Sequence, residues 1–342
     1  MNAKVHPLLA FLVIVLTIVA IGVWMWGDSR ARQLGGPADL LVDPSGHLYV
    51  QMQHYLLEHD TAGEFVQRHD LSALGVERVL GGMAFFPDGD LLLRRGEDTR
   101  SLFDNIRAYL RLPNKRPAQA DTPGIGLHRC DLRTGQCREF GPHGIDFSAA
   151  FSVFIDPATQ DVYISDTSRH RLLKFSSDGT LIAEGGSGLR FPNELQLIDG
   201  RLYVANTNRH SIDVVDPDTD GFAAAVASKD VVPLPAQRSG QTWPSNFAQI
   251  GEEWWVNNMR SDMADGGVYI FDRNWMYERS VNLPDDADPI TILRFDDDVL
   301  VSDWNKDIVH RVALDGRLLG EFQSSGLQVL IDESVELRWQ YR

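Results

Sequence analysis

The chain has 342 residues and a formal net charge of −16, from 48 acidic and 32 basic side chains. This balance argues against nucleic acid as a partner, because phosphate binding requires a basic face. It also disfavours extensive contact with anionic lipid head groups.

The first feature along the chain is an apolar segment, PLLAFLVIVLTIVAIGVWMW, over residues 7–26. As a helix rising about 1.5 Å per residue it would cross roughly 30 Å, the hydrocarbon thickness of a bilayer. It predicts a single-pass transmembrane signal anchor, with the lipid bilayer as a partner, a short cytoplasmic tail at 1–6 and a linker at 27–36. Ser29-Arg30-Ala31 fits the small-x-small cleavage pattern, so a signal peptide cleaved after Ala31 is the alternative.

After the linker, one short hydrophobic strand followed by a polar turn recurs six times. The middle residues of the six strands are 43, 71, 40, 52 and 45 positions apart. A period near 40–45 residues of β-type sequence is typical of a propeller with one four-stranded blade per repeat. The strands are Leu48-Tyr49-Val50, Leu91-Leu92-Leu93, Val162-Tyr163-Ile164, Leu202-Tyr203-Val204, Trp254-Trp255-Val256 and Val299-Leu300-Val301.

The predicted fold class is all-β, a six-bladed β-propeller over residues 37–327 behind the N-terminal transmembrane helix. Blades are expected at about 37–75, 80–143, 147–188, 190–234, 242–284 and 287–327. In the tail, 328–342, the run Val335-Glu336-Leu337-Arg338-Trp339 alternates like a strand. It predicts a strand that pairs with an outer edge or helps to close the ring.

The long second spacing indicates an insertion at about 96–124 in blade two. Its apolar residues at 102, 103, 106, 109 and 110 have helical spacing, which predicts a short amphipathic helix over one face of the propeller. Packing on a neighbouring blade and a lid or docking element are the two roles considered for it.

Cys130 and Cys137 flank a hairpin turn with a two-residue loop expected at Arg133-Thr134. Facing positions in a non-hydrogen-bonded antiparallel pair suit a disulfide. The predicted disulfide indicates an oxidising compartment, so we expect the propeller outside the cytoplasm, periplasmic or extracellular. A pair of reduced thiols is the alternative.

Two blades carry a motif that resembles a known family. Blade three has Asp166, Thr167, His170 and Arg171 in its polar turn, and blade four repeats the pattern as Asn-Thr-Asn-Arg-His over 206–210. Both turns are similar to the NHL repeat, with its Asp-Thr-x-Asn-His-Arg turn, apolar strand and Asp-Gly turn. The resemblance implies a six-bladed propeller and leaves activity open.

The turns between strands two and three fall on one face, together with the start of each blade. We expect that face to carry the ligand or partner candidates: Asp166, His170, Asn206, His210, Asn257 and Trp304. Asp and Asn also cap turns, so repetition alone accounts for most of this polar ring.

A metal site is implied by a more distant resemblance, to the gluconolactonase, paraoxonase and strictosidine-synthase propellers. Their ligands fall here on Asn193, Asn246 and Asp303, hard oxygen donors that suit Ca²⁺ as a Lewis acid on an ester or lactone. Zn²⁺ on His170 and His210, as in α-hydroxyglycine lyase propellers, is a second variant without a third ligand. The pattern departs from the family at the start of blade one, which has Gly36-Pro37-Ala38-Asp39 and no Glu, and Glu194 is no clear substitute.

Two functions follow. The first is a membrane-anchored extracytoplasmic propeller that binds a protein partner or a small-molecule ligand. The second is a metal-dependent hydrolase, lactonase or lyase of the same architecture, with Ca or Zn as the cofactor. The sequence contains no Gly-x-Ser-x-Gly elbow, P-loop or His-Glu-x-x-His motif.

Overall fold

The computed structural model describes most of the chain after the N-terminal segment. The described residues are 13–22, 36–76, 78–79, 82–96, 126–142, 144–145, 147–148, 151–219, 221–222, 226–230, 242–259, 266–304 and 306–340.

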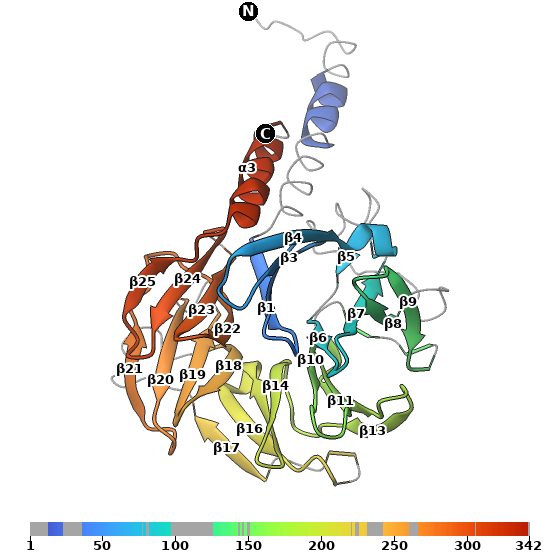
Figure 1. The fold of residues 1–342 in the computed structure, drawn as a ribbon, viewed down its shortest axis with the longest axis vertical. Helices are drawn as coiled ribbons and strands as arrows, with labels where there is room; N and C mark the ends of the chain where they lie inside the picture. Colours follow the sequence, from blue (N-terminus) through green and yellow to red (C-terminus); the bar gives the residue numbers. More distant parts are fainter. Residues whose placement is uncertain are drawn as a thin grey trace, which may run out of the picture.

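Six antiparallel sheets stand around one axis, as Figure 1 shows, and the all-β six-bladed propeller is confirmed. Each sheet uses strands that follow one another in the chain. Blade one is β1 (Pro37–Val42), β2 (Leu48–Met52), β3 (Tyr55–His59) and β4 (Phe65–Asp70); blade two is β5 (Arg78–Val79), β6 (Ala84–Phe85), β7 (Leu91–Gly96), β8 (Gly126–Asp131) and β9 (Gln136–Phe140); blade three is β10 (Phe151–Ile155), β11 (Val162–Asp166), β12 (Arg171–Phe175) and β13 (Leu181–Gly185). Blade four is β14 (Pro192–Ile198), β15 (Arg201–Asn206), β16 (Ser211–Val215) and β17 (Ala227–Asp230); blade five is β18 (Pro244–Ile250), β19 (Glu253–Asn258), β20 (Gly267–Phe271) and β21 (Tyr277–Val281); blade six is β22 (Pro289–Phe295), β23 (Asp298–Asp303), β24 (Ile308–Ala313) and β25 (Leu318–Glu321).

The six hydrophobic strands of the sequence pattern are the second strands of the blades. In blade two this strand is β7, because β5 and β6 both pair with it on the inner side. The central residues of the six strands are buried, except for the partly buried Tyr203, because each blade packs its two faces on its neighbours. One hydrophobic cluster, for example, joins Leu92 of blade two to Ile164 of blade three. Burial on two faces explains why these strands are apolar without alternation.

Two faces of the propeller follow from the alternating strand directions. We call the face where the innermost strands begin and the strand 2–3 turns lie the upper face. The opposite face, with the strand 1–2 and 3–4 turns, is the lower face. The chain reaches blade one on the upper face: a side chain on Gly36 would lie 2.8 Å from the carbonyl oxygen of Trp304, in a strand 2–3 turn.

Blade two contains the expected disulfide. Cys130 and Cys137 are direct partners across β8 and β9, with their Cα atoms 4.1 Å apart. The expected two-residue loop is wrong: Asp131 pairs with Gln136, so the loop has the four residues Leu132–Gly135. The carboxylate of Asp131 accepts the N–H of Arg133 at 2.8 Å and stabilises this longer turn. The helix expected in the insertion at 96–124 lies almost wholly outside the described residues.

The predicted strand in the tail is wrong. Residues Ser325–Gln340 form a helix, α3, which begins after the N-cap Ser324, whose Oγ accepts the N–H of Leu327 at 3.1 Å. Leu327, Leu330 and Ile331 have helical spacing and pack into the seam between blades six and one. That spacing lies before the alternating run on which the strand was predicted, and burial of these side chains determines the conformation.

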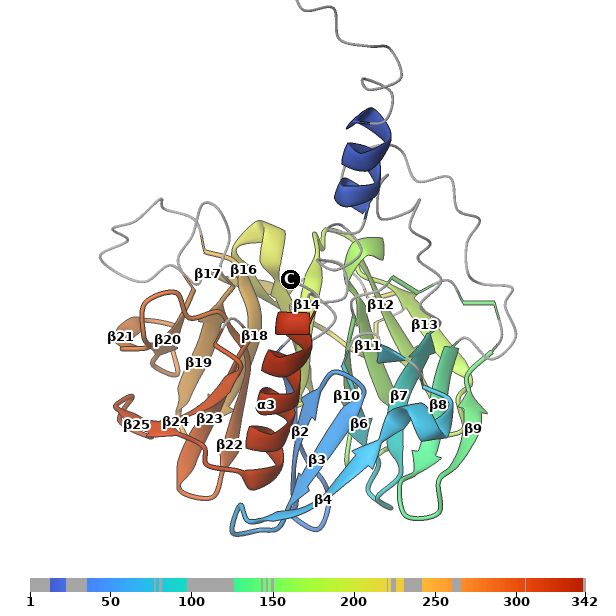
Figure 2. The same ribbon diagram turned by 90° about the horizontal axis from the view of Figure 1, so that it is seen from above.

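α3 also covers an edge strand. It lies against β4, the outer strand of blade one, as Figure 2 shows, and Arg68 on β4 lies 3.5 Å from Glu333. Covering the outer strand β4 in this way removes an unpaired sheet edge.

Ring closure comes from apolar packing at the seam between blades six and one, and from the Thr291 hydroxyl, which donates to the carbonyl of Ala38 at 3.2 Å.

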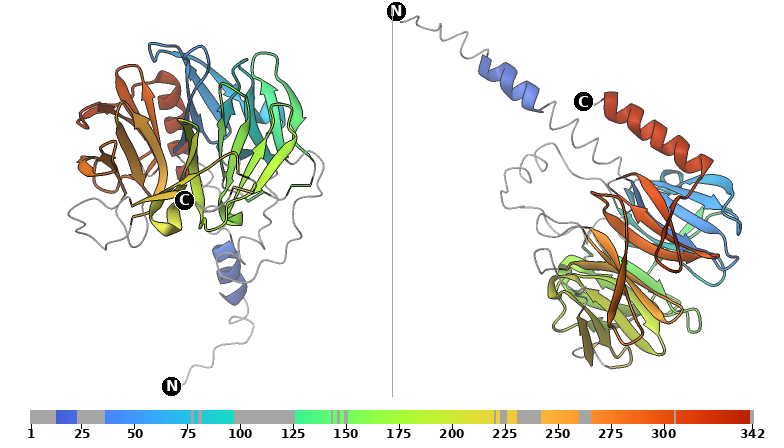
Figure 3. Two further views of the ribbon diagram at one scale, coloured as in Figure 1. Left: turned by 90° about the horizontal axis from the view of Figure 1, so that it is seen from below. Right: turned by 90° about the vertical axis from the view of Figure 1, so that its left-hand side faces the viewer.

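The N-terminal segment is described only at residues 13–22, which form a helix beyond the upper face (Figures 2 and 3). In the described part of the chain, no helix is long and apolar enough to cross a membrane. Half of the predicted span 7–26 lies outside the described residues, so the anchor stays a prediction.

Candidate functional site

The Asp and Asn residues of the polar ring hold each blade together. Asp166, Asn206 and Asp303 end the second strands of blades three, four and six, and each accepts a backbone N–H from just before its own blade's first strand. The donors are the N–H groups of Ser148 at 2.8 Å, Arg190 at 2.7 Å and Asp288 at 3.0 Å. Asn258, at the same position in blade five, accepts from Trp243. This repeated contact fastens the start of the blade to its strand 2–3 turn.

Asn257 has a related role between blades. Its Oδ1 accepts from the backbone N–H groups of Ser245 and Asn246, at 3.2 and 2.5 Å. Its Nδ2 donates to the carbonyl oxygen of Pro289 at 2.8 Å, which links blade five to blade six. The side chain is buried, so these bonds satisfy its polar atoms in place of a ligand.

His170 and His210 occupy equivalent positions at the ends of two short 3₁₀ turns, with φ of 56° and 61°. The Nδ1 of His170 accepts the N–H of Phe191 at 2.9 Å, and the Nδ1 of His210 bonds to the carbonyl of Thr242. Each imidazole thereby fixes the segment that leads into the next blade. No three His, Cys, Asp or Glu side chains among the described residues come together in a way that could hold a metal ion.

The three predicted metal ligands have separate partners. Asn193 donates to the Thr207 hydroxyl at 2.6 Å. Asp303 accepts from Nε2 of the buried His310 at 3.0 Å as well as from Asp288. Burial opposes ionisation of Asp303, but the bonds from His310 and Asp288 outweigh it and lower the pKa of this carboxyl. Of these three residues, only Asn246 bonds to an acidic side chain, the carboxyl of Glu194.

The residues that face one another at the axis come instead from the innermost strands. Asp39 on β1 accepts the N–H of Leu40 at 3.0 Å and the N–H of Met83 at 3.3 Å. The side chain of Thr291 on β22 is also hydrogen-bonded to it. Asp39 therefore connects blades one, two and six.

Glu194 on β14 makes the corresponding contacts in the other half of the ring. It accepts from Nδ2 of Asn246 on β18 at 2.9 Å, and from the hydroxyl of Ser152 on β10. The Oδ1 of Asn246 in turn accepts the N–H of Ile292 at 2.9 Å. Glu194 thus connects blades three, four and five, and the two carboxyls together reach all six blades.

The two carboxyls influence each other's charge. Burial raises the pKa of Asp39 to about 7. Burial, together with the negative charge of Asp39, raises the pKa of Glu194 to about 8. Asp39 and Glu194 lie among the inner strands and are partly buried. A pair of this kind binds either protons or a cation near neutral pH.

A sequence signal for this pair exists. Four innermost strands begin with Pro, and the residue two positions later points to the same place in each blade. The strand register shifts at this point in all four, which marks a β-bulge that re-aims the side chain. The four triplets are Pro37-Ala38-Asp39, Pro192-Asn193-Glu194, Pro244-Ser245-Asn246 and Pro289-Ile290-Thr291. The equivalence of Asp39 and Glu194 becomes visible only when these triplets are aligned on their Pro residues.

Trp304 is the remaining predicted candidate. It lies in the strand 2–3 turn of blade six and is 41% exposed, on the upper face. Trp254 and Trp255 of blade five, by contrast, are buried between blades. An exposed indole on a polar face is available to a partner.

Comparison with known proteins identifies the fold. No protein-family model matches the chain, and no curated protein matches it in sequence. Among solved structures it is similar to virginiamycin B lyase from Staphylococcus aureus, with a TM-score of 0.54 and 14% identity over 83% of each chain. A putative gluconolactonase gives a TM-score of 0.53 and 12% identity, covering 80% of this chain and 87% of the other. Hydrazine synthase from Kuenenia stuttgartiensis gives 0.51 and 13%, covering 90% and 84%.

Proposed function

We propose that this chain is a divalent-cation-dependent hydrolase of esters or lactones, with its site at the propeller axis. The carboxyls of Asp39 and Glu194 would hold the cation, and Asn246 would orient Glu194 through its Nδ2. The observation that carries the proposal is the pair of partly exposed carboxyls, on facing inner strands, with raised pKa values. The propeller fold shared with a putative gluconolactonase and with virginiamycin B lyase is compatible with such chemistry but does not imply it.

The chemistry of the donor atoms favours Ca²⁺. Carboxylate oxygens are hard ligands, and waters complete the shell of Ca²⁺ in many sites. Zn²⁺ prefers His and Cys. The Nδ1 of His170 accepts a backbone N–H, so its Nε2 carries the proton, and His170 and His210 have no third ligand beside them in the described part of the chain. When bound, the cation would polarise a carbonyl group as a Lewis acid. Ser152 and Thr291 would position the two carboxyls through their hydroxyls.

The direct test is a cation titration. Protein stripped with a chelator is titrated with CaCl₂, and separately with ZnCl₂, while its thermal unfolding is followed. We expect Ca²⁺ to raise the Tm of the wild type and of Asp297→Asn, a carboxyl exposed on the lower face. Glu194→Gln and Asp39→Asn should not respond. Hydrolysis of a simple lactone and an aryl ester is measured in parallel, and a Tm that no cation moves would refute the proposal.

A binding propeller without chemistry of its own is the second candidate. The exposed Trp304 on the upper face is the observation that favours it. A protein that unfolds at the same temperature with and without cations, and hydrolyses neither probe, would support this candidate.

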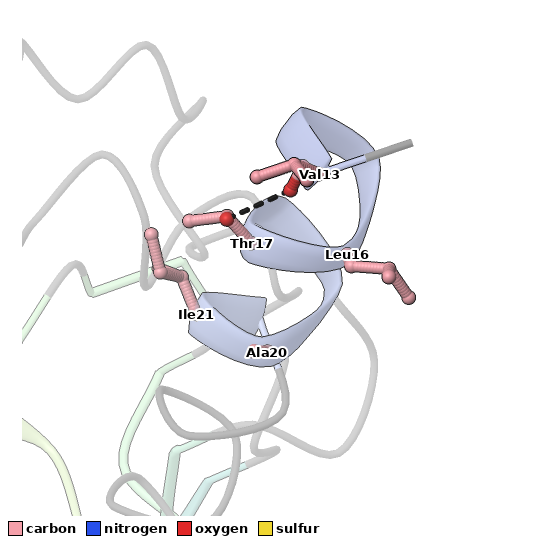
Figure 4. Close-up of a pocket in the computed structure, with 5 residues that line it drawn as sticks. All are labelled: Val13, Leu16, Thr17, Ala20 and Ile21. Atoms are coloured by element: carbon pink, nitrogen blue, oxygen red, sulfur yellow. Dashed lines mark hydrogen bonds between the residues drawn. The ribbon is translucent and has the colours of Figure 1, made fainter. Parts of the chain in front are cut away.

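We also propose that the chain is a membrane-tethered protein with its propeller in an oxidising compartment. In helix 13–22 every side chain except Thr17 is apolar. Figure 4 shows one face of this helix, with Val13, Leu16, Ala20 and Ile21 beside Thr17. Most of its side chains are more than half exposed, for example Leu16 at 58% and Ile18 at 63%. Since a helix that is apolar all round is normally buried in protein or lipid, a bilayer is the expected environment. The disulfide agrees with the compartment.

Alkaline carbonate extraction tests the tether. The intact chain should remain in the membrane pellet. Release of a protein that begins at Arg32 would establish cleavage after Ala31 instead.

A further inference from the structure

We infer that the propeller stands with its upper face against the bilayer surface, so that the axial carboxyls open toward the membrane. This inference rests on the proposed tether. It concerns the orientation of the propeller, which the tether alone does not determine.

The path of the chain gives the first argument. Described structure resumes at Gly36, which lies beside Trp304 on the upper face. If residues 7–26 span the bilayer, ten peptide steps separate the end of the span from Gly36. Ten extended residues reach at most about 36 Å. If the lower face stood against the bilayer, these residues would have to pass around a blade and along its height, which would use all of that length. If the upper face stands against the bilayer, they lead to Gly36 directly.

The distribution of charge gives the second argument. On the lower face every strand 1–2 turn carries a carboxylate. These are Asp43, Asp88, Asp156, Asp199, Glu252 and Asp296. Acidic residues recur at the strand 3–4 hairpins, as at Asp60, Asp178 and Asp315. The acidic excess of the chain is therefore concentrated on one face, where an anionic lipid surface repels it.

The upper face differs in the residues that the structure describes there. Exposed basic side chains occupy its turns, beside acidic ones such as Asp285 and Asp286. The basic residues are Arg169, Arg190, Arg209 and Lys306. The exposed Trp304 is an aromatic residue of the kind enriched at lipid head groups. The net charge disfavours lipid contact for the protein as a whole, but not for this face.

The axial site is close to this face. Asp39 and Glu194 are each the third residue of an innermost strand, near the end at which the strand begins. A substrate that reaches them from the upper face would therefore arrive from the space between the propeller and the lipid head groups.

The test compares two serines of blade three. Ser168 lies on the upper face and Ser177 on the lower, and both are exposed. The full chain, as Ser168→Cys or Ser177→Cys, is labelled with a nitroxide and reconstituted into vesicles that contain a lipid with a head-group nickel chelate. We expect the label at 168 to be relaxed by nickel at least three times as strongly as the label at 177.

Lipid composition sharpens the test. The contrast between the labels should grow when anionic lipid replaces neutral lipid, and it should weaken in Arg190→Glu and Arg209→Glu. Equal relaxation at both positions, or stronger relaxation at 177, would overturn the orientation while the tether stands. Loss of the chain from the carbonate pellet would refute the tether, and the orientation with it.

Discussion

The ring of strand 2–3 turns and the ring of axial residues use the same kinds of side chain for different purposes. At the turns, Asp166, Asn206, Asn258 and Asp303 repeat one contact from blade to blade. At the axis, the equivalent positions change with each blade: Asp39, Ser152, Glu194, Asn246 and Thr291. Repeated chemistry is what a propeller needs in order to fold. Chemistry that varies at an equivalent position breaks the repeat, and this distinguishes a candidate site from the scaffold.

The largest effect should come from the turn ring. Asp303→Ala removes the acceptor for the N–H of Asp288 and leaves His310, which is only 1% exposed, without its carboxylate. Leaving buried hydrogen-bonding groups without their acceptor costs about 1–3 kcal/mol. We expect a loss of that order in urea unfolding, with Ca²⁺ still raising the Tm of the folded fraction. A variant as stable as the wild type would place Asp303 among the site residues.

The second effect belongs to the axis. Glu194→Gln keeps a side chain that can bond to Asn246 and Ser152 but removes the charge. We expect the fold to persist and the affinity for Ca²⁺ to fall about 100-fold or more, as for loss of a metal ligand. Calorimetric titration measures it, with Asp297→Asn as the matched carboxyl control. Unchanged affinity would remove Glu194 from the site.

The third prediction uses the pH dependence of folding stability to distinguish the axial carboxyls from the carboxyl of Asp303 in the turns. Because the folded-state pKa values of Asp39 and Glu194 lie above their ordinary values of 3.8 and 4.5, the folded chain binds more protons than the unfolded one. The stability from these groups is present at low pH and is lost as pH rises from about 4 to about 8. Asp303 behaves in the opposite sense, since its lowered pKa gives stability that is lost on acidification.

A comparison of variants with the wild type isolates the contribution of Asp39 and Glu194 to this dependence of stability on pH. The decline between pH 5 and 8 should be shallower in Asp39→Asn and in Glu194→Gln than in the wild type, without added cations. The affinity for Ca²⁺ should rise over the same interval, because the cation competes with protons. Parallel profiles for all three proteins would contradict the raised pKa values.

The sequence predicted the scaffold well because the scaffold is repetitive. Six apolar strands at a regular period, each bounded by turn residues, are enough to identify the six blades. Cys130 and Cys137 were likewise close in sequence, so their pairing followed from one hairpin. The alternation of residues 335–341 predicts a strand, whereas the helical spacing of Leu327, Leu330 and Ile331 and their burial at the seam determine the helix α3.

The axial pair was less visible for a physical reason. Asp39 and Glu194 are more than 150 residues apart in the sequence, and only closure of the ring brings the two inner strands to one axis. The bulge after each Pro then decides which side chain faces inward. The Asp and Asn residues of the strand 2–3 turns can be recognised in the sequence because they directly follow the hydrophobic strands, although their role is structural.

The smallest effect tests how the axis is held together. Thr291→Val preserves shape but removes the hydroxyl that donates to the carbonyl of Ala38 and whose hydrogen bond with Asp39 lowers the pKa of that carboxyl. Loss of one such bond costs about 1 kcal/mol, which thermal unfolding resolves. The hydroxyl lowers the pKa of Asp39, so its removal should raise that pKa further and weaken Ca²⁺ binding at pH 7 more than at pH 9. Thr291→Ser, which retains the hydroxyl, should restore the affinity. If Val and Ser behave alike, the contact serves ring closure alone, and the axial ring is structural at this blade, as the turn ring is elsewhere.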